Sequence, residues 1–173
     1  NWKFNANFSY QNLKSDNFRR IKDLLGATFA RNLDAYSNEG SNQWNLDNPD
    51  YKVYEGDRTQ YSYILNKNTY AINLSTEIDL PRWNVVASVF ASHSESYRDG
   101  QFRNHFYAVG NQSKGKSDVY NTTDAGMKAK VTYKIDGKNF LVYTGAFFTL
   151  APTLNEIFVN PRTTNLITPE IQN

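Results

Sequence analysis

The sequence predicts an all-β fold, an antiparallel up-and-down meander that forms part of a transmembrane β-barrel. Three features predict it: apolar and polar residues alternate, aromatic residues stand near the ends of alternating segments, and long connections alternate with tight ones. Successive side chains leave a strand on opposite faces, so alternation predicts strands with one apolar and one polar face. Aromatic belts and unequal loops are typical of outer-membrane barrels.

Residues 1–11 carry the clearest alternation. Lys3 and the other odd-numbered residues after it are polar, whereas the even-numbered residues are Trp2, Phe4, Ala6, Phe8 and Tyr10. A soluble sandwich normally packs an aliphatic face on its second sheet, but here aromatic residues bracket a small one. The pattern is typical of a barrel strand with lipid on one side and a wet lumen on the other.

Residues 14–57 predict a long irregular stretch that is rich in turn residues. It opens with a predicted short helix, which Asp16 would cap and Gly26 would end. The apolar face of this helix would consist of Phe18, Ile21 and Leu25. A loop of this length counts against a compact soluble domain, whereas barrels carry such loops on their outer side.

Residues 59–80 and the segment that begins at Trp83 predict the next two strands, joined by a two-residue turn at Pro81 and Arg82. The apolar residues change parity near residues 66–68, which predicts a bulge there. A second irregular stretch covers residues 97–120.

Residues 125–135 predict the fourth strand, and Asp136-Gly137 predicts a type I′ hairpin turn. A two-residue loop would place Tyr133 opposite Phe140 and Val131 opposite Val142. A three-residue loop would reverse the faces of the fifth strand. From Ala151 onward the alternation ends, and a third irregular stretch follows.

The connections therefore run long, tight, long, tight, long. In an antiparallel meander this order places every tight turn at one end and every long loop at the other. Tight periplasmic turns and long extracellular loops are the arrangement of outer-membrane barrels, and Greek-key sandwiches seldom keep it.

Composition excludes several classes of protein. The sequence has no run of about 18 apolar residues, so a transmembrane helix is not expected. The net charge is +2, with 19 basic and 17 acidic residues that are well mixed, which argues against nucleic acid as a partner. There is no cysteine, so neither a disulfide framework nor a thiolate metal site is expected.

Nothing in the sequence predicts an enzyme, a cofactor or a metal site. His93 and His105 are the only histidines, and there is no Gly-rich phosphate loop or nucleophile elbow. Four acidic residues have the oxygen atoms that Ca²⁺ prefers, but their spacing fits no EF-hand, so solvated turn carboxylates are favoured: Asp47, Asp50, Glu55 and Asp57.

Charged residues on the polar faces of the predicted strands are expected to form pairs with residues of neighbouring strands. Lysines along the fourth strand form either a basic track for an anionic substrate or partners of nearby carboxylates, and the second is favoured: Lys128, Lys130 and Lys134. Glu77 and Asp79 are expected beside Lys3, in a cross-strand pair worth about 0.2–1 kcal/mol.

Ligand contacts are expected from aromatic residues in the long loops. Aromatic rings with Asn and Arg nearby suit sugars, peptides or chelates, and they equally suit packing of one loop on another. The candidate ligand-binding residues are Trp44, Tyr51, Tyr54, Phe102, Phe106 and Tyr107. Arg162 is expected to brace its own loop.

The most specific sequence signal lies in residues 145–173. A strand there ends at Ala151-Pro152, a loop contains Asn160-Pro161-Arg162, and Thr168-Pro169-Glu170 follows. This segment resembles TonB-dependent outer-membrane receptors of the Bacteroidetes type. Residues 45–57 and 81–83 also look like parts of that family, and the resemblance covers most of the chain.

The resemblance implies a 22-stranded transmembrane β-barrel plugged by an N-terminal domain, of which residues 1–173, with about five strands, would be about a quarter. The implied function is uptake of a scarce nutrient, such as a siderophore, glycan, peptide or vitamin, across the outer membrane. The implied partners are outer-membrane lipid, the rest of the barrel, its plug, TonB acting through that plug, and a surface lipoprotein. Because no plug is recognised here, the chain is expected to be a piece of a longer protein.

Two alternatives stay open at this point. The first is a soluble β-sandwich that binds carbohydrate. The second is a passive outer-membrane porin or an outer-membrane enzyme built on a similar barrel.

Overall fold

The computed structural model describes residues 1–33, 43–105 and 112–171. Its long strands form one sheet in the order β1-β4-β5-β7-β8, so strands that follow each other in the chain are neighbours. The predicted all-β antiparallel meander is confirmed. The long strands are β1 (Trp2–Arg20), β4 (Arg58–Asp79), β5 (Trp83–Gly100), β7 (Tyr120–Lys134) and β8 (Phe140–Phe148).

The remaining elements are short. β2 (Ala30–Arg31) pairs with β3 (Lys52–Val53), and β6 (Gly115–Lys116) pairs with the end of β5. The helical elements are α1 (Leu154–Ile157) and the 3₁₀ turn η3 (Pro169–Ile171). Neither of these, nor any other helix in the described ranges, has the length and apolarity to cross a membrane.

The predicted helix that begins at Asp16 is wrong. Residues 16–20 continue β1, and Leu25 and Gly26 form a turn with φ values of 52° and 87°. Asp16 forms an ion pair with Arg58 of β4 at 2.7 Å instead of capping a helix. Arg58 also stacks on Phe18, 4.1 Å from the ring centroid. Pairing with a strand far along the chain therefore overrides the weak local helix signal.

Contacts divide the chain into two units. We call Asn1–Asn12, Asn68–Glu95 and Asn121–Ala151 the sheet unit, and Leu13–Lys67, Ser96–Tyr120 and Pro152–Asn173 the loop unit. The sheet unit holds both tight turns, and the loop unit holds the long connections.

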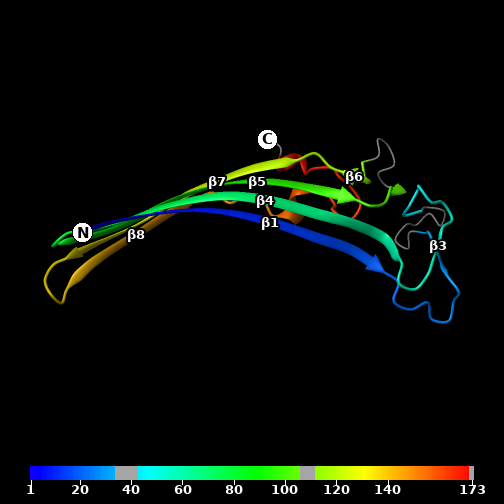
Figure 1. The fold of residues 1–173 in the computed structure, drawn as a ribbon, viewed down its shortest axis with the longest axis horizontal. Helices are drawn as coiled ribbons and strands as arrows, with labels where there is room; N and C mark the ends of the chain where they lie inside the picture. Colours follow the sequence, from blue (N-terminus) through cyan, green and yellow to red (C-terminus); the bar gives the residue numbers. More distant parts are fainter. Residues whose placement is uncertain (34–42, 106–111, 172–173) are drawn as a thin grey trace. The chain divides into compact units, whose positions relative to one another are not determined.

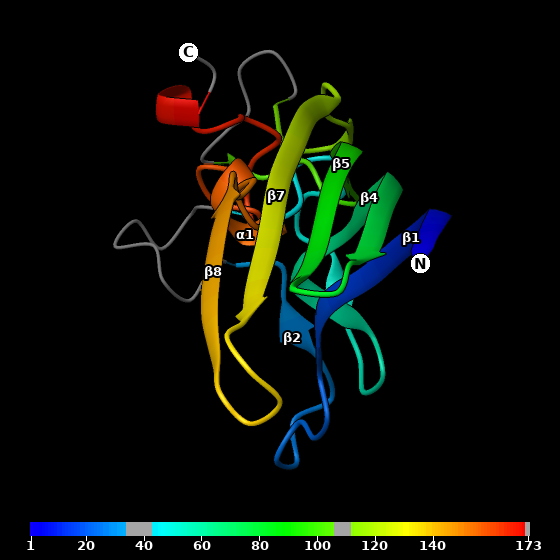
Figure 2. The same ribbon diagram turned by 90° about the vertical axis from the view of Figure 1, so that its left-hand side faces the viewer.

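In the sheet unit, the strands lie side by side in chain order, with β1 and β8 at the two edges (Figures 1 and 2). The N-terminus and both tight turns gather at the same end of these strands (Figure 1). The backbone N–H of Leu80 donates to the carbonyl oxygen of Trp83 at 2.7 Å, which confirms the two-residue turn at Pro81 and Arg82.

The β7–β8 hairpin decides between the two loop lengths that the sequence left open. Tyr133 lies opposite Leu141, and Val131 lies opposite Tyr143, so the two-residue loop is wrong. The three-residue alternative agrees with this register, and it gives Leu141 and Tyr143 the same face as Val131.

The side chain of Asp136 explains the longer hairpin loop. Its carboxylate accepts the backbone N–H groups of Lys138 at 2.8 Å and Asn139 at 2.7 Å, and it accepts the side-chain amide of Asn139 at 2.8 Å. The amide of Asn139 and then the two backbone N–H groups lower the pKa of Asp136. Gly137 has no positive φ, so the type I′ geometry is absent from this turn.

The bulge predicted near residues 66–68 does not interrupt the pairing of β4 with β5. Hydrogen bonds join Leu80 to Trp83, Thr69 to Ser94, and Gln101 to Ser62. From the first pair to the last, the residue number falls along β4 by as much as it rises along β5. Neither strand therefore has an extra residue relative to the other over this range. The change of parity has another cause. The odd-numbered Tyr63 and Leu65 belong to the core of the loop unit.

One face of the sheet unit is apolar and open, and we call it the apolar face. Ring contacts join it across strands, at 5.1 Å between Tyr10 and Tyr70 and at 4.6 Å between Trp83 and Tyr133. Trp2 is 75% exposed and Tyr143 is 74% exposed. Other side chains of this face are Phe4, Phe8, Ile72, Leu74, Val85, Val89, Met127, Val131, Leu141 and Phe147.

The opposite face of the sheet unit carries polar pairs. Lys3 and Glu77 form the expected cross-strand pair, with nitrogen and oxygen 3.3 Å apart. Lys134 lies 2.9 Å from Asp79, so this lysine of β7 is partnered as favoured. These pairs are exposed, so each contributes little to stability.

Buried apolar side chains are confined to the loop unit within the described ranges. Its core cluster consists of Tyr63, Leu65, Ile157 and Phe158. In the sheet unit, Trp2, Phe4 and Ile72 stay exposed, and no apolar side chain of its described residues is buried. The sheet unit therefore has two open faces and no core of its own.

Gly126 creates the space for an aromatic pair on the polar face. A Cβ atom added to Gly126 would lie 2.3 Å from the ring of Phe90 and 2.8 Å from Cβ of Phe148. Phe90 breaks the polar alternation of β5, and the missing side chain on the neighbouring strand accommodates its ring.

We expect Gly126→Ala to lower the free energy of unfolding by about 1–3 kcal/mol, because overpacking forces neighbouring atoms apart. The measurement is denaturant unfolding of the full-length protein. Gly137→Ala is the matched control, since an added Cβ there meets no atom within 4 Å. Equal unfolding midpoints for the two variants would contradict the prediction.

Candidate functional site

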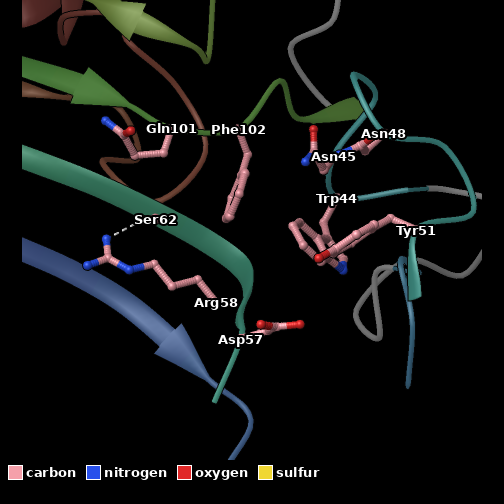
Figure 3. A pocket seen from close by; sticks show the side chains of 9 residues that line it. All are labelled: Trp44, Asn45, Asn48, Tyr51, Asp57, Arg58, Ser62, Gln101 and Phe102. Atoms are coloured by element: carbon pink, nitrogen blue, oxygen red, sulfur yellow. Dashed lines mark hydrogen bonds between the residues drawn. The ribbon is translucent and has the colours of Figure 1, made fainter. Parts of the chain in front are cut away.

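A pocket of about 460 Å³ lies in the loop unit and brings together three of the predicted aromatic residues (Figure 3). It is open to solvent and mixes ring, amide and charged groups. Its lining consists of Trp44, Asn45, Asn48, Tyr51, Asp57, Arg58, Ser62, Gln101 and Phe102. The residues come from the 21–57 connection, from the start of β4 and from the segment after β5, so distant parts of the chain build it.

The aromatic residues of this pocket have different exposure. Trp44 is 1% exposed, and its ring meets that of Phe102 edge-on, with centroids 4.8 Å apart and planes at 63°. Tyr51 is 41% exposed. Trp44 therefore packs one loop on the other, whereas Tyr51 offers an open ring to a ligand. The indole N–H of Trp44 is buried without a hydrogen-bond partner among the described residues.

The other predicted aromatic residues do not join this pocket. Tyr54 is 52% exposed and is not part of its lining. Phe106 and Tyr107 lie outside the described residues.

Arg58 supplies a fixed positive charge to the pocket wall. Its guanidinium donates to both carboxylate oxygens of Asp16, at 3.0 and 2.7 Å, and to the hydroxyl of Ser62 at 2.9 Å (Figure 3). A two-pronged pair of this kind holds the guanidinium in one orientation. Asp57 is also held, because its carboxylate accepts the backbone N–H of Tyr54 at 2.9 Å.

Asn32 organises the loop that carries most of the lining, and sequence reasoning missed it. It is 1% exposed, and its side-chain amide donates to the carbonyl oxygens of Asn45 at 2.8 Å and Asn48 at 2.6 Å. Its side-chain oxygen accepts the backbone N–H of Asn45 at 3.1 Å. The Asn-rich composition of this stretch does not distinguish Asn32 from its neighbours, so the sequence held no signal for this role.

Asp47 ties the first long connection to the second. Its carboxylate lies 3.0 Å from Nε of Arg103 and 2.5 Å from Nζ of Lys114. The backbone N–H of Leu46 donates to the carbonyl oxygen of Arg103 at 2.8 Å. Among the described residues, no group of three or more His, Asp or Glu is placed to hold a metal ion.

Arg98 anchors the third long connection, and this role was also missed. It is 2% exposed, and its guanidinium donates to the carbonyl oxygens of Pro161 at 2.6 Å and Ser113 at 2.7 Å, and to the side chain of Asn165. No described carboxylate forms an ion pair with it. Gly100 makes this approach possible, because an added Cβ would lie 1.9 Å from the oxygen of Ser113.

The two histidines belong to different units. Nδ1 of His93 is 3.3 Å from the hydroxyl of Thr123 in the sheet unit, and Nδ1 of His105 is 2.8 Å from the carbonyl oxygen of Gln43 in the loop unit. Neither residue lines the pocket of Figure 3.

Comparison with protein-family models, with curated proteins and with solved structures found no match for this chain.

The chemistry of the pocket suits binding of a ligand that has a flat apolar side and polar edges. Tyr51 and Phe102 supply rings, and the amides of Asn48 and Gln101 supply both donors and acceptors. Such a mixture of a few placed polar groups with aromatic walls is typical of ligand sites.

We expect Asn32→Asp to loosen the pocket loop, because the new carboxylate faces backbone oxygens that lose their donor. A buried group left unpaired costs about 1–3 kcal/mol, and a charged group more. The measurement is the rate of trypsin cleavage after Arg31 and Lys52 in the full-length protein. Asn48→Asp is the control, since Asn48 contributes only its backbone oxygen to this network. Equal cleavage rates for the two variants would refute the assigned role of Asn32.

Proposed function

We propose that this chain forms wall and extracellular loops of an outer-membrane TonB-dependent receptor of the Bacteroidetes type. In this proposal the strands belong to a 22-stranded barrel, about a quarter of which lies in residues 1–173. The receptor takes up a scarce nutrient and closes its bore with a plug domain. The observation that carries the proposal is the open apolar face of a sheet whose other face holds the ion pairs and most of the polar side chains.

Exposed apolar area favours lipid as the neighbour of that face. Soluble monomers rarely expose a continuous apolar patch of more than a few hundred Å². Here the face extends over five strands and includes exposed rings such as Trp2, Phe8 and Tyr143. Lipid removes this area from water without a second protein layer, and a wet bore suits the Lys, Asn and Ser side chains opposite.

The free edges of the sheet favour a larger barrel. No described strand pairs with the outer side of β1 or β8. Open edges promote aggregation, and known membrane barrels need about eight strands or more to close. Further strands on both sides of this segment satisfy both requirements.

The lengths of the connections favour one orientation of the strands across the membrane. The tight turns at Pro81 and Asp136 suit the periplasmic side, and the long connections suit the cell surface. The pocket of the loop unit then faces the medium from which a nutrient arrives, with Tyr51, Phe102 and Gln101 as its candidate contacts.

A spin label at residue 127 tests which medium covers the apolar face. Met127→Cys and Lys128→Cys are neighbours on β7 with opposite directions, and the chain has no other cysteine. In lipid vesicles holding the full-length protein, without other cysteines, we expect the label at 127 to collide with oxygen and not with a polar nickel chelate. The label at 128 is expected to show the reverse.

The soluble sandwich makes a different prediction. A second sheet over the apolar face would shield the label at 127 from oxygen and from the nickel chelate alike. That result, or a full-length protein that stays in the aqueous fraction, would overturn the membrane assignment.

Energy dependence separates a TonB-dependent receptor from a passive porin. We expect nutrient uptake through the full-length protein to stop when the proton gradient of the inner membrane is collapsed, because TonB transmits force derived from it. The measurement is uptake by cells that carry or lack the gene, grown on candidate siderophores, glycans, peptides or vitamins. Uptake that continues without the gradient would favour the porin.

A further inference from the structure

A second pocket in the loop unit has a different chemistry from that of the pocket in Figure 3. It encloses about 370 Å³ and is lined by Asp16, Asn17, Phe18, Tyr61, Tyr63 and Arg162. Aromatic rings form its walls, and Arg162 contributes a guanidinium from the third long connection.

The expectation that Arg162 braces its own loop stays a prediction, and other groups hold the backbone of this loop. The side chain of Asn160 accepts the backbone N–H of Arg162 at 3.1 Å, and the carbonyl oxygen of Asn160 accepts the N–H groups of Thr163 and Thr164 at 3.0 Å. Arg98 holds the carbonyl oxygen of Pro161. These contacts shape the loop through backbone groups, and within the described ranges the side chain of Arg162 has no hydrogen-bond partner.

The guanidinium of Arg162 is positioned by a ring. Its central carbon lies 5.2 Å from the centroid of Tyr61, and it makes no ion pair with any carboxylate in the described ranges. A cation–π contact orients a guanidinium while leaving its N–H donors available.

The surroundings of the pocket carry a surplus of positive charge. Arg58 and Arg20 both lie over the ring of Phe18, at 4.1 and 5.2 Å. The one carboxylate in the lining, that of Asp16, is already paired with Arg58 at 2.7 Å. The charge of Arg162 therefore has no compensating charge within the lining.

We propose that this second pocket binds the oxyanion group of an acidic ligand, either a carboxylate or a sulfate or phosphate, with Arg162 as its principal contact. The planar guanidinium matches such groups with two parallel hydrogen bonds. The ring of Tyr61 adds aromatic surface for the uncharged part of the ligand. This inference rests on the proposed receptor function, and it narrows the imported nutrient to an acidic one.

Titration calorimetry of the full-length protein in detergent tests the proposal with defined probes. Glucuronate is compared with glucose, and sulfate with chloride, at constant ionic strength. We expect glucuronate or sulfate to bind and glucose and chloride not to bind. Arg162→Gln is expected to weaken that binding at least tenfold. Arg162→Lys is expected to weaken it less, because lysine keeps the positive charge but cannot donate the two parallel hydrogen bonds of a guanidinium. Lys138→Gln, in an exposed tight turn, is the control for loss of one positive charge.

The calorimetry results identify the class of oxyanion or overturn the proposed pocket. Binding of glucuronate alone identifies an organic carboxylate as the source, and binding of sulfate alone identifies a tetrahedral oxyanion. Absence of binding by both anions, or equal affinity of wild type and Arg162→Gln, overturns the pocket. Circular dichroism of the variants checks that they fold. Failure here leaves the spin-label and proton-gradient results untouched, so it is distinguishable from failure of the receptor function.

Discussion

An apolar sheet face that no described segment of the chain covers is the constraint on which the rest of this structure depends. Hydrogen bonds between neighbouring strands satisfy the backbone of the sheet unit, but they do nothing for exposed rings such as Trp2 and Tyr143. The hydrophobic effect disfavours that surface in water by roughly 25 cal/mol for each Å². Removing this apolar surface from water would therefore be favourable, and the ion pairs of the sheet unit lie on its opposite face.

In the loop unit, the main physical requirement is to give hydrogen-bond partners to the polar groups of irregular backbone. Irregular backbone cannot pair with itself along a ladder, so side chains must satisfy its polar groups. Asn32 does so for the first long connection, and Arg98 does so for the second and third. Around these two residues the loop unit buries Trp44 and the cluster that contains Tyr63 and Phe158. Both pockets described above are lined by residues of this loop unit.

The errors of sequence-based prediction have physical causes that these residues show. Residues 16–25 carry a helical spacing and a capping residue, but Asp16 gains an ion pair with Arg58 and its segment joins β4. Asp136-Gly137 has the composition of a tight turn, but the carboxylate of Asp136 gathers three N–H donors and favours a longer loop. Asp16 pairs with a residue far along the chain, which the local pattern does not encode, whereas Asp136 binds groups two and three residues further on.

By itself the sequence determined the five long strands, their order, the position of the tight turns and the apolar parity of the first four strands, whereas the faces of β8 were decided by the structure. It did so because a two-residue period is a local property that each strand carries in its own residues. Only the tertiary structure decided which loop residues meet, since contacts such as Asn32 with Asn45, or Arg98 with Pro161, join residues far apart in the chain. Three of the predicted aromatic residues line one pocket. The position of Arg162 over the ring of Tyr61 could not be read from the sequence, because it depends on how the third long connection folds.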